Sequence, residues 1–251
     1  PAVLKGVQNL KVDVLNYQAL KKCIQGFDVV INCVGQITSP INACLQLNSQ
    51  GMSNLARAAA QTEARIIHIS TVAVYGTAMH VTETSALNPE TPYATCKAYA
   101  EFILQQQLDP ARLTIMRLSN LYGETQTKGI IAYLQKTYRT PEKLSFNNNG
   151  DLRRYYLHVD DCATVIAQVM EQDAFSGTYN LIGKEQFTIK ELLRLLSSVT
   201  GKTLEVGFAD REPEENITHV DDTKIHQALP ISYQRSIRSI FHELSIKPTL
   251  V

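Results

Sequence analysis

The stretch from Ile66 to Gln107 constrains the fold of this chain more than any other. It opens with an apolar, β-branched run, which is typical of a strand buried on both faces. Ser70 and Thr71 mark the point where such a strand would emerge into a loop. After Pro92 the residues favour a helix from Ala94 onward. The stretch therefore predicts a buried strand, a polar loop and a helix.

Tyr93 and Lys97 are four residues apart, so on this helix their side chains share one face. A free phenol titrates near pH ~10, and a neighbouring ammonium favours its ionised form. A phenol beside an ammonium is the arrangement that a hydride-transfer enzyme needs. Lowering the phenol pKa by ~2–3 units needs about 3–4 kcal/mol, which Lys97 and the positively charged nicotinamide of such an enzyme could supply. The hydroxyl of Thr71 is suited to hold the same substrate oxygen. The bare pair is equally typical of a surface lysine beside a half-buried tyrosine, but the preceding strand end favours a catalytic set of Thr71, Tyr93 and Lys97.

Several motifs occur in the order and spacing of a known family. They are VDVLNYQAL, DVVINCVG, LNSQGMSNLARAAA, STVAVYG, PYATCK, RLSNLYGE, GDLRRYYLHVDD and DDTKIHQAL. With them the chain resembles the extended short-chain dehydrogenases/reductases, in particular the NAD-dependent nucleotide-sugar epimerase/dehydratase group. The resemblance implies an α/β fold, a Rossmann-like doubly wound parallel sheet with a smaller α/β substrate-binding lobe.

The resemblance also divides the chain. It assigns residues 1–120 to the NAD-binding Rossmann-like domain and residues 121–251 mainly to the substrate lobe, with a segment at about 155–182 returning to the first domain. Leu10–Val14 and Asp28–Gly35 would be the third and fourth strands of the sheet, with a helix from Ala19 to Gln25 between them.

None of the 12 glycines forms a G-x-G-x-x-G phosphate loop. We therefore expect an N-terminal truncation of a strand–helix–strand unit of at least ~30 residues. At this stage it stays open whether the chain binds a cofactor or is active by itself.

The resemblance implies NAD as the cofactor, and NADP is not excluded because the discriminating residue would lie in the missing unit. Asp13 matches a position that contacts adenine, although an aspartate there also suits a simple turn. Asn48 matches a helix asparagine near the active site. The expected cofactor-binding residues are Asp13, Val14, Cys33, Val34, Gly35, Asn48, Ser70, Tyr93 and Lys97.

Four residues are expected to bind a nucleoside-diphosphate sugar: Thr71, Asn120, Arg154 and Arg211. The planar guanidinium of arginine suits two phosphate oxygens. Tyr155 stands where the family usually has an aspartate, which leaves the orientation of Arg154 open, and Arg153 could substitute for it. Asn120 also suits a turn, and the glutamates after Arg211 equally favour a surface ion pair there.

Composition excludes several classes of function. Lys+Arg and Asp+Glu are both 24, so nothing indicates binding to nucleic acid or an anionic membrane. The five cysteines are scattered and are expected to be reduced, in a cytoplasmic protein. No apolar run has the length of a bilayer span. The six histidines show no metal-ligand spacing, so no metal is expected, and Asp160 and Asp161 are interpreted as a helix cap.

The two residues after Thr71 bear on the reaction. Relatives that dehydrate or decarboxylate the sugar carry acidic residues there, whereas this chain has Val72 and Ala73, which cannot move a proton. This disfavours dehydration and decarboxylation. Because Asn120, Arg154 and Arg211 would fit a nucleoside diphosphate, we favour an NAD(P)-dependent nucleotide-sugar epimerase, feeding polysaccharide biosynthesis. The alternatives are an NAD(P)H-dependent nucleotide-keto-sugar reductase or a non-catalytic binding member of the fold. By resemblance, the alanine-rich helix and the Tyr93 helix would form a homodimer interface.

Overall fold

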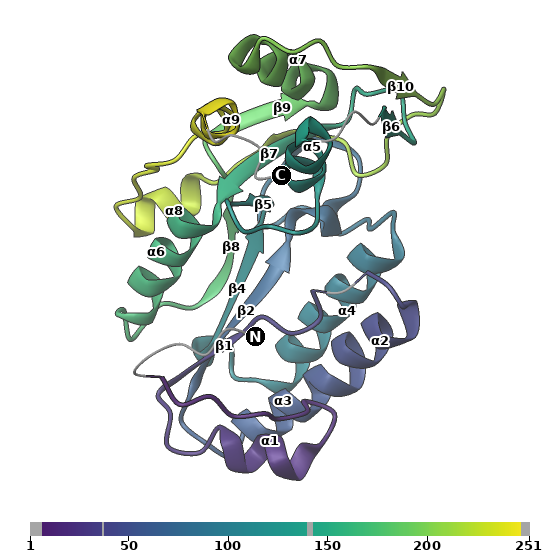
Figure 1. The fold of residues 1–251 in the computed structure, drawn as a ribbon. Coiled ribbons are helices and arrows are strands. Elements are labelled where there is room, and N and C mark those ends of the chain that lie inside the picture. The colour runs from purple at the N-terminus through teal and green to yellow at the C-terminus, as the bar shows by residue number, and fades with distance from the viewer. Residues whose placement is uncertain (1–6, 37, 140–142, 247–251) are drawn as a thin grey trace.

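A four-stranded parallel sheet with the order β1-β2-β4-β8 forms the centre of the molecule (Figure 1). The computed structural model describes residues 7–36, 38–139 and 143–246. The strands are β1 (Val29–Asn32), β2 (Arg65–Thr71), β4 (Leu113–Leu118) and β8 (Gly177–Leu181). All six residues of β4 are buried, as are the five central residues of β2. Continuous apolar strands of this kind belong in a sheet covered on both faces.

Helices cover both faces of this sheet (Figure 1). On one side lie α1 (Tyr17–Cys23), α2 (Ile41–Gln46), α3 (Met52–Ala59) and α4 (Pro92–Gln107). A π-helical segment (Leu47–Gly51) joins α2 to α3. On the other side lie α6 (Val159–Met170) and α8 (Thr223–Ala228). One core cluster contains residues of α1, α3, α4 and β2, and another contains residues of α6, α8, β4 and β8.

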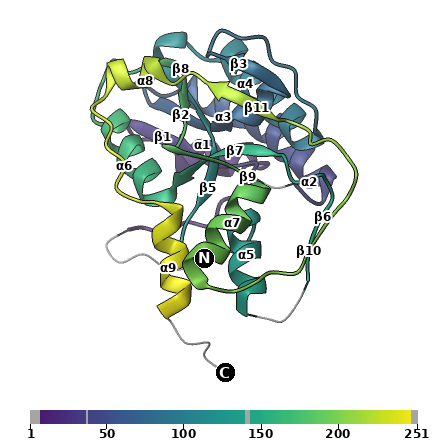
Figure 2. The same cartoon turned by 90° about the horizontal axis from the view of Figure 1, so that it is seen from above.

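A second, smaller part of the molecule packs around a three-stranded sheet with the order β5-β7-β9. Its strands are β5 (Asn120–Tyr122), β7 (Arg153–His158) and β9 (Glu185–Thr188), and its helices are α5 (Ile130–Arg139), α7 (Ile189–Thr200) and α9 (Ile237–Ile246). The three helices share one apolar core with this sheet (Figure 2). Thr188 and Glu191 form a capping box at the start of α7.

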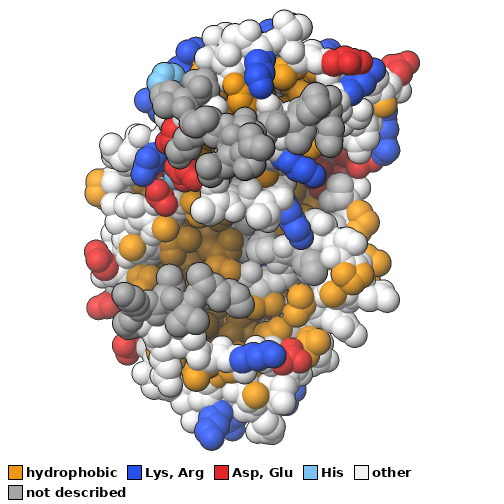
Figure 3. All heavy atoms as spheres, viewed as in Figure 1, with side chains coloured by type: hydrophobic (Ala, Val, Ile, Leu, Met, Phe, Trp, Pro, Cys, Tyr) orange, Lys and Arg blue, Asp and Glu red, His pale blue; other side chains and the backbone are white. Residues whose placement is uncertain are grey.

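Short strands and 3-10 turns make up the rest of the regular structure in the described residues. The strands are β3 (Ala78–Val81), β6 (Leu144–Phe146), β10 (Val206–Phe208) and β11 (Ile217–Val220), and the turns are Val72–Tyr75 and Pro110–Arg112. β3 pairs with β11, and β6 pairs with β10. On the face seen in Figure 3, the molecule is hollowed between its upper and lower parts, and apolar side chains gather in the hollow.

The fold class predicted from the sequence is confirmed, since the structure is an α/β protein with a parallel sheet of Rossmann type. All five cysteines are free thiols, as expected. No helix within the described ranges is both long and apolar enough to cross a membrane. The predicted domain boundary at residue 120 and the predicted return of the segment at about 155–182 stay predictions. β8, which lies in that segment, pairs with β4 of the main sheet.

Two local predictions were wrong. Leu10–Val14 is not a strand but an irregular segment, because the Asp13 carboxylate accepts a hydrogen bond from Leu15 N at 2.9 Å and closes a turn. The cap of α6 is His158, whose ring accepts from Asp160 N at 3.2 Å. Asp161 instead accepts from backbone N–H groups in the segment that leads to α9.

A buried ion pair fastens α4 to β4 beneath the carboxyl end of the main sheet. Arg117 on β4 and Glu101 on α4 lie 2.7 Å apart, and their side chains are 5% and 1% exposed. The Glu101 carboxylate also accepts from the Ser70 hydroxyl, and Arg117 donates to the Tyr75 hydroxyl at 2.8 Å. Tyr75 in turn donates to Asn180 on β8 at 2.7 Å. The network therefore joins α4 to three neighbouring strands of the structure's core.

We predict that Arg117→Leu lowers the free energy of unfolding by about 3–5 kcal/mol, because it leaves the Glu101 carboxylate buried without its partner. Urea unfolding followed by circular dichroism measures this loss. The double variant Arg117→Leu/Glu101→Leu serves as the control and should recover part of it, since no unpaired charge remains. A double variant less stable than the single one would contradict this account.

Candidate active site

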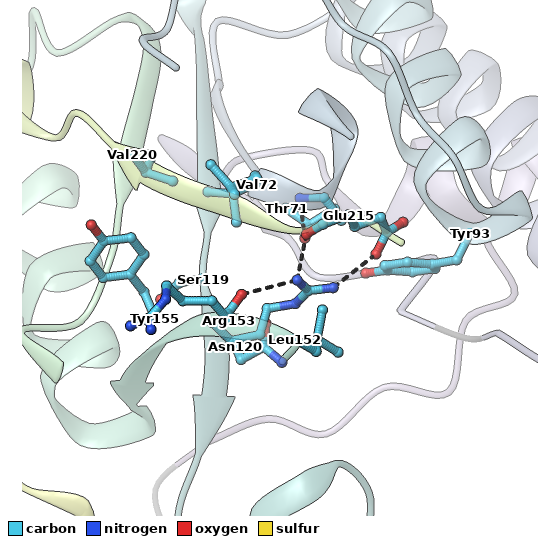
Figure 4. A pocket seen from close by; sticks show the side chains of 13 residues that line it. Thr71, Val72, Tyr93, Ser119, Asn120, Leu152, Arg153, Tyr155, Glu215 and Val220 are labelled. Atoms are coloured by element: carbon cyan, nitrogen blue, oxygen red, sulfur yellow. Dashed lines mark hydrogen bonds and ion pairs between the residues drawn. The ribbon is translucent and has the colours of Figure 1, made fainter. Parts of the chain in front are cut away.

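The carboxyl end of β2 opens onto a cavity of about 270 Å³ between the two parts of the molecule. Ligands of open α/β sheets collect at this edge. Residues from distant parts of the chain line the cavity, among them Thr71, Tyr93, Asn120, Arg154, Tyr155 and Glu215. Figure 4 shows Tyr93 reaching into this space from α4, with Glu215 beside it and Thr71 on the adjoining wall.

Thr71 is the last residue of β2 and caps the 3-10 turn that follows it. Its hydroxyl accepts a hydrogen bond from Ala73 N at 3.2 Å, which leaves the hydroxyl proton available to the cavity. The side chain is half-buried. Thr71 is therefore fixed in position and can donate to an oxygen bound beside it.

Tyr93 lies in the first turn of α4, which begins at the cap residue Thr91. Its hydroxyl donates to Gln36 Oε1 at 2.5 Å, and Gln36 Nε2 donates to the Ile69 carbonyl at 3.0 Å. Burial raises the pKa of Tyr93 above that of a free phenol, and the nearby Cys44 and Glu215 raise it further. The predicted lowering by the Lys97 ammonium is therefore not found in the chain alone, where Tyr93 is held as a proton donor.

Lys97 lies one turn further along α4 and is fully buried. Its ammonium donates to the Ile69 carbonyl at 2.7 Å, and its Nζ lies 3.3 Å from His68 Nε2. Burial lowers the pKa of Lys97 to about 8, against the opposing charge of Glu101. Tyr93 and Lys97 thus meet through Gln36 and the Ile69 carbonyl, because the lysine turns toward the backbone of β2.

Asn48 holds the turn that follows β1. It lies in the π-helical segment and is 1% exposed. Its Nδ2 donates to the carbonyls of Gly35 at 3.2 Å and Cys44 at 2.9 Å, while its Oδ1 is buried with no hydrogen-bond partner in the described residues. Gly35 has φ +86°, and a Cβ there would lie 2.3 Å from Asn48 Oδ1. Only glycine fits this turn.

The other predicted cofactor residues differ in where they lie. Cys33 is exposed and Val34 half-buried in the turn that Asn48 holds. Asp13 is exposed in the turn before α1, whereas the Val14 side chain is buried in the core. Ser70 is 2% exposed and its hydroxyl donates to Glu101, so the structure places that hydroxyl in the buried network.

Of the predicted substrate residues, Asn120 is exposed at the start of β5 and lines the cavity. Arg154 donates to the carbonyls of Glu214 and Glu215, and its guanidinium lies 3.6 Å from the Glu215 carboxylate. Arg211 forms an exposed ion pair with Glu214 at 2.5 Å. Both arginines line a second cavity of about 190 Å³.

Sequence reasoning missed Gln36 and Glu215. Gln36 follows the Gly35 turn without a motif of its own, and its role depends on a hydrogen bond to Tyr93 across 57 positions of the chain. Glu215 lies in a loop whose glutamates indicated surface ion pairs, yet its carboxylate accepts from Thr91 at 2.5 Å and pairs with Arg154. Burial raises the pKa of Glu215.

Residues 2–182 match the model of the NAD dependent epimerase/dehydratase family. The β subunit of methionine adenosyltransferase 2 from Rattus norvegicus is 30% identical over 72% of this chain and 58% of its own length. The dTDP-glucose 4,6-dehydratase of Mycobacterium tuberculosis (strain CDC 1551 / Oshkosh) is 26% identical over 81% of this chain and 60% of its own length. The chain thus spans somewhat more than half the length of these curated relatives.

Among solved structures, a UDP-glucuronic acid 4-epimerase from Bacillus cereus in complex with UDP-glucuronic acid and NAD superposes with a TM-score of 0.82. It is 24% identical, and the match covers 94% of this chain and 79% of that one. At this level of identity the similarity shows the fold.

The low pKa of Lys97 predicts a rise in stability with pH. Between pH ~8 and ~10.5 the unfolded chain keeps a proton on Lys97 that the folded chain has released, so the free energy of unfolding rises with pH. From about pH 7.5 to 9.5 we expect the unaltered chain to gain about 2 kcal/mol relative to Lys97→Met.

Urea unfolding of both chains at these two pH values measures the difference between their free energies of unfolding. The contributions of the other titrating groups are the same in both chains and cancel in this difference. Lys184→Met, which removes an exposed lysine, is the control and should show a flat difference. A flat difference for Lys97→Met as well would show that the folded and unfolded chains hold the Lys97 proton equally.

Proposed function

The chain belongs to the NAD dependent epimerase/dehydratase family, and on this basis we propose that it acts as an NAD-dependent nucleotide-sugar epimerase. The observation that carries the proposal is the shared cavity. Thr71 and Tyr93, which can hold and exchange the proton of a sugar hydroxyl, line the same space as Asn120 and Arg154. A proton-transfer pair and groups suited to a diphosphate thus face one cavity.

The residues at the carboxyl end of the sheet fit a nicotinamide dinucleotide. Lys97 has three donors but a single carbonyl acceptor in the described residues, and the Asn48 Oδ1 is buried without a donor. Lys97, Asn48 and the Gly35 turn would hold the dinucleotide, with Cys33 exposed beside them. NAD bound there supplies the acceptor and donor of hydride.

Tyr93 performs the proton transfer in this proposal. A sugar hydroxyl placed between Thr71 and Tyr93 takes the position of the Gln36 amide on the phenol, and Thr71 donates to its oxygen. With NAD bound to accept and return the hydride, Tyr93 would take the hydroxyl proton as the sugar carbon is oxidised and would give it back as the keto sugar is reduced from the opposite face. This exchange requires an ionised phenol, so the charge of Lys97 and of the nicotinamide must offset the effect of burial.

Arg154 and Asn120 bind the nucleotide part. The guanidinium fork of Arg154 pairs with Glu215, a carboxylate that occupies the place suited to a phosphate oxygen. A nucleoside diphosphate is expected to displace Glu215 from the fork. Arg211 lines the neighbouring cavity, and it can bind the diphosphate as well once its ion pair with Glu214 is broken.

Glu215 also favours a second candidate, elimination of water from the sugar. Val72 and Ala73 have no exchangeable side-chain proton, but Glu215 brings a carboxyl group to the same cavity as Tyr93. Burial raises the pKa of Glu215, so it holds a proton more readily. Product analysis separates the candidates: an epimerised sugar, a 4-keto-6-deoxy sugar from elimination, or a reduced sugar from a ketoreductase.

Cytoplasmic location and a role in polysaccharide biosynthesis stay predictions.

We propose a homodimer through α2 and α4. The alanine-rich helix expected at this interface is α3, but Ala56, Ala58 and Ala59 are buried in the core of the chain, so the proposed surface moves to α2. The outer faces of these helices expose four large apolar side chains, Ile41, Leu45, Tyr99 and Phe102. The rings of Tyr99 and Phe102 stack with centroids 6.4 Å apart. Exposed apolar side chains gathered on adjoining helices are typical of a protein interface.

We expect Tyr93→Phe to lower turnover of a nucleotide sugar at least ~100-fold, because the ring remains but the exchangeable proton is lost. Turnover is measured by chromatography of the sugar products, and binding of UDP and NAD by calorimetry. Tyr138→Phe, on α5 and outside the lining of the cavity, is the matched control and should be unaffected. Near-normal turnover of Tyr93→Phe would assign proton transfer to another group, and a chain that binds neither ligand would refute the proposal.

Phe102→Glu is expected to convert the dimer into a monomer, because it buries a charge in an apolar interface. Size-exclusion chromatography with light scattering measures the mass of each species. Phe27→Glu, an equally exposed phenylalanine outside α2 and α4, is the control and should stay dimeric. An unaltered chain that is monomeric at micromolar concentration, or a dimeric Phe102→Glu variant, would contradict this interface.

A further inference from the structure

Beneath the proposed site, a buried polar chain connects β1 to α4. Asn32 at the end of β1 is 4% exposed, and His68 on β2 and Lys97 on α4 are fully buried. Asn32 Nδ2 lies 2.8 Å from His68 Nδ1, and His68 Nε2 lies 3.3 Å from Lys97 Nζ. The proposed reaction uses Lys97 but assigns nothing to Asn32 or His68.

The amide of Asn32 is oriented by its other contacts. Its Oδ1 accepts from Val34 N at 3.0 Å, so that atom is the carbonyl oxygen. Its Nδ2 contacts two acceptors, Met52 Sδ at 3.0 Å and His68 Nδ1 at 2.8 Å. Because both hydrogens of the amide are directed at acceptors, His68 Nδ1 must carry a lone pair rather than a proton.

This fixes the tautomer of His68. The ring is neutral, since burial and the charge of Lys97 lower its pKa well below the usual value. With Nδ1 unprotonated, the single proton is on Nε2, and this N–H is directed at Lys97 Nζ. A neutral amine can accept from it, whereas an ammonium would meet another donor and keep only the Ile69 carbonyl as acceptor in the described residues.

We propose that His68, held as its Nε2–H tautomer by Asn32, is a positioning residue that lowers the pH at which Lys97 loses its charge. This rests on the proposed function, in which the Lys97 ammonium supports proton exchange by Tyr93. His68 thereby sets the upper pH limit of that exchange, although it does not touch the substrate cavity.

The other groups that face Lys97 act in the opposite direction. Glu101 on α4, Cys33 after β1 and Cys44 on α2 each favour the ammonium when ionised, and they only partly offset burial. Glu101 is also held by Arg117 at 2.7 Å, which limits its effect on Lys97. His68 on β2 is thus the neighbour that presents a donor to Lys97.

The tautomer is tested in the unaltered full chain. Imidazole ¹⁵N labelling with two-bond ¹H–¹⁵N correlation spectra distinguishes protonated from unprotonated ring nitrogens. We expect His68 to show an unprotonated Nδ1 and a protonated Nε2 from about pH 6 to 9. A proton on Nδ1, or a doubly protonated ring, would overturn the proposal without any measurement of turnover.

The effect on Lys97 is tested by titration of ¹³C-labelled lysine in the unaltered chain and in His68→Leu. Removal of the N–H is expected to raise the pH midpoint of Lys97 by about 0.5 unit or more, a threefold change in its proton affinity. Met116→Leu, a fully buried substitution in another core cluster, is the control and should leave the midpoint unchanged. An unchanged midpoint in His68→Leu would refute the role of His68.

If His68→Leu does not fold, as a thermal melt would show, Asn32→Ala replaces it. Loss of the amide frees the tautomer, so the His68 spectrum should show protonation of both nitrogens in exchange, and the Lys97 midpoint should rise. Retention of the original tautomer in Asn32→Ala would contradict the role of Asn32. Where turnover is measurable, its upper pH limit should move upward with the Lys97 midpoint. Failure of the proposed function would remove turnover but leave both spectra as expected.

Discussion

Burial of the Lys97 ammonium against the backbone of β2 is the interaction on which the site depends. The Ile69 carbonyl accepts from Lys97 at 2.7 Å and from Gln36 at 3.0 Å, and Gln36 holds the Tyr93 hydroxyl. One backbone oxygen therefore sets the positions of the amine and, through Gln36, of the phenol. A buried ammonium needs a hydrogen-bond acceptor, so this hydrogen bond, together with apolar packing, fixes how α4 lies against β2.

Buried polar contacts hold the scaffold around this site. α4 is anchored from below by the Glu101–Arg117 ion pair, and Arg117 in turn contacts Tyr75 and so reaches β8. Beside it, Asn48 connects the Gly35 turn to α2 by donating to the backbone carbonyls of Gly35 and Cys44. These contacts satisfy buried polar groups that would otherwise destabilise the fold, and they fix the loops at the carboxyl edge of the sheet. Stability and site geometry thus share the same residues.

Local patterns in the sequence suffice for the elements whose residues interact mainly with their neighbours in the chain. The β2 run and the α4 helix were predicted closely, because continuous burial and helix propensity act over neighbouring residues. Leu10–Val14 has the composition of a strand but forms a turn, since the Asp13 side chain bonds its own backbone. Gln36 and Glu215 were missed because their partners lie far away in the sequence.

The sequence by itself determined the α/β class, the buried strand and helix that present Thr71, Tyr93 and Lys97, and the family, because these follow from short-range periodicity and motif spacing. Only the tertiary structure decided that Lys97 turns to the Ile69 carbonyl, that Glu215 occupies the Arg154 fork, and that Asn32 fixes the tautomer of His68. Hydrogen-bond orientation and desolvation depend on which groups the fold brings together across the chain, and no local pattern encodes them.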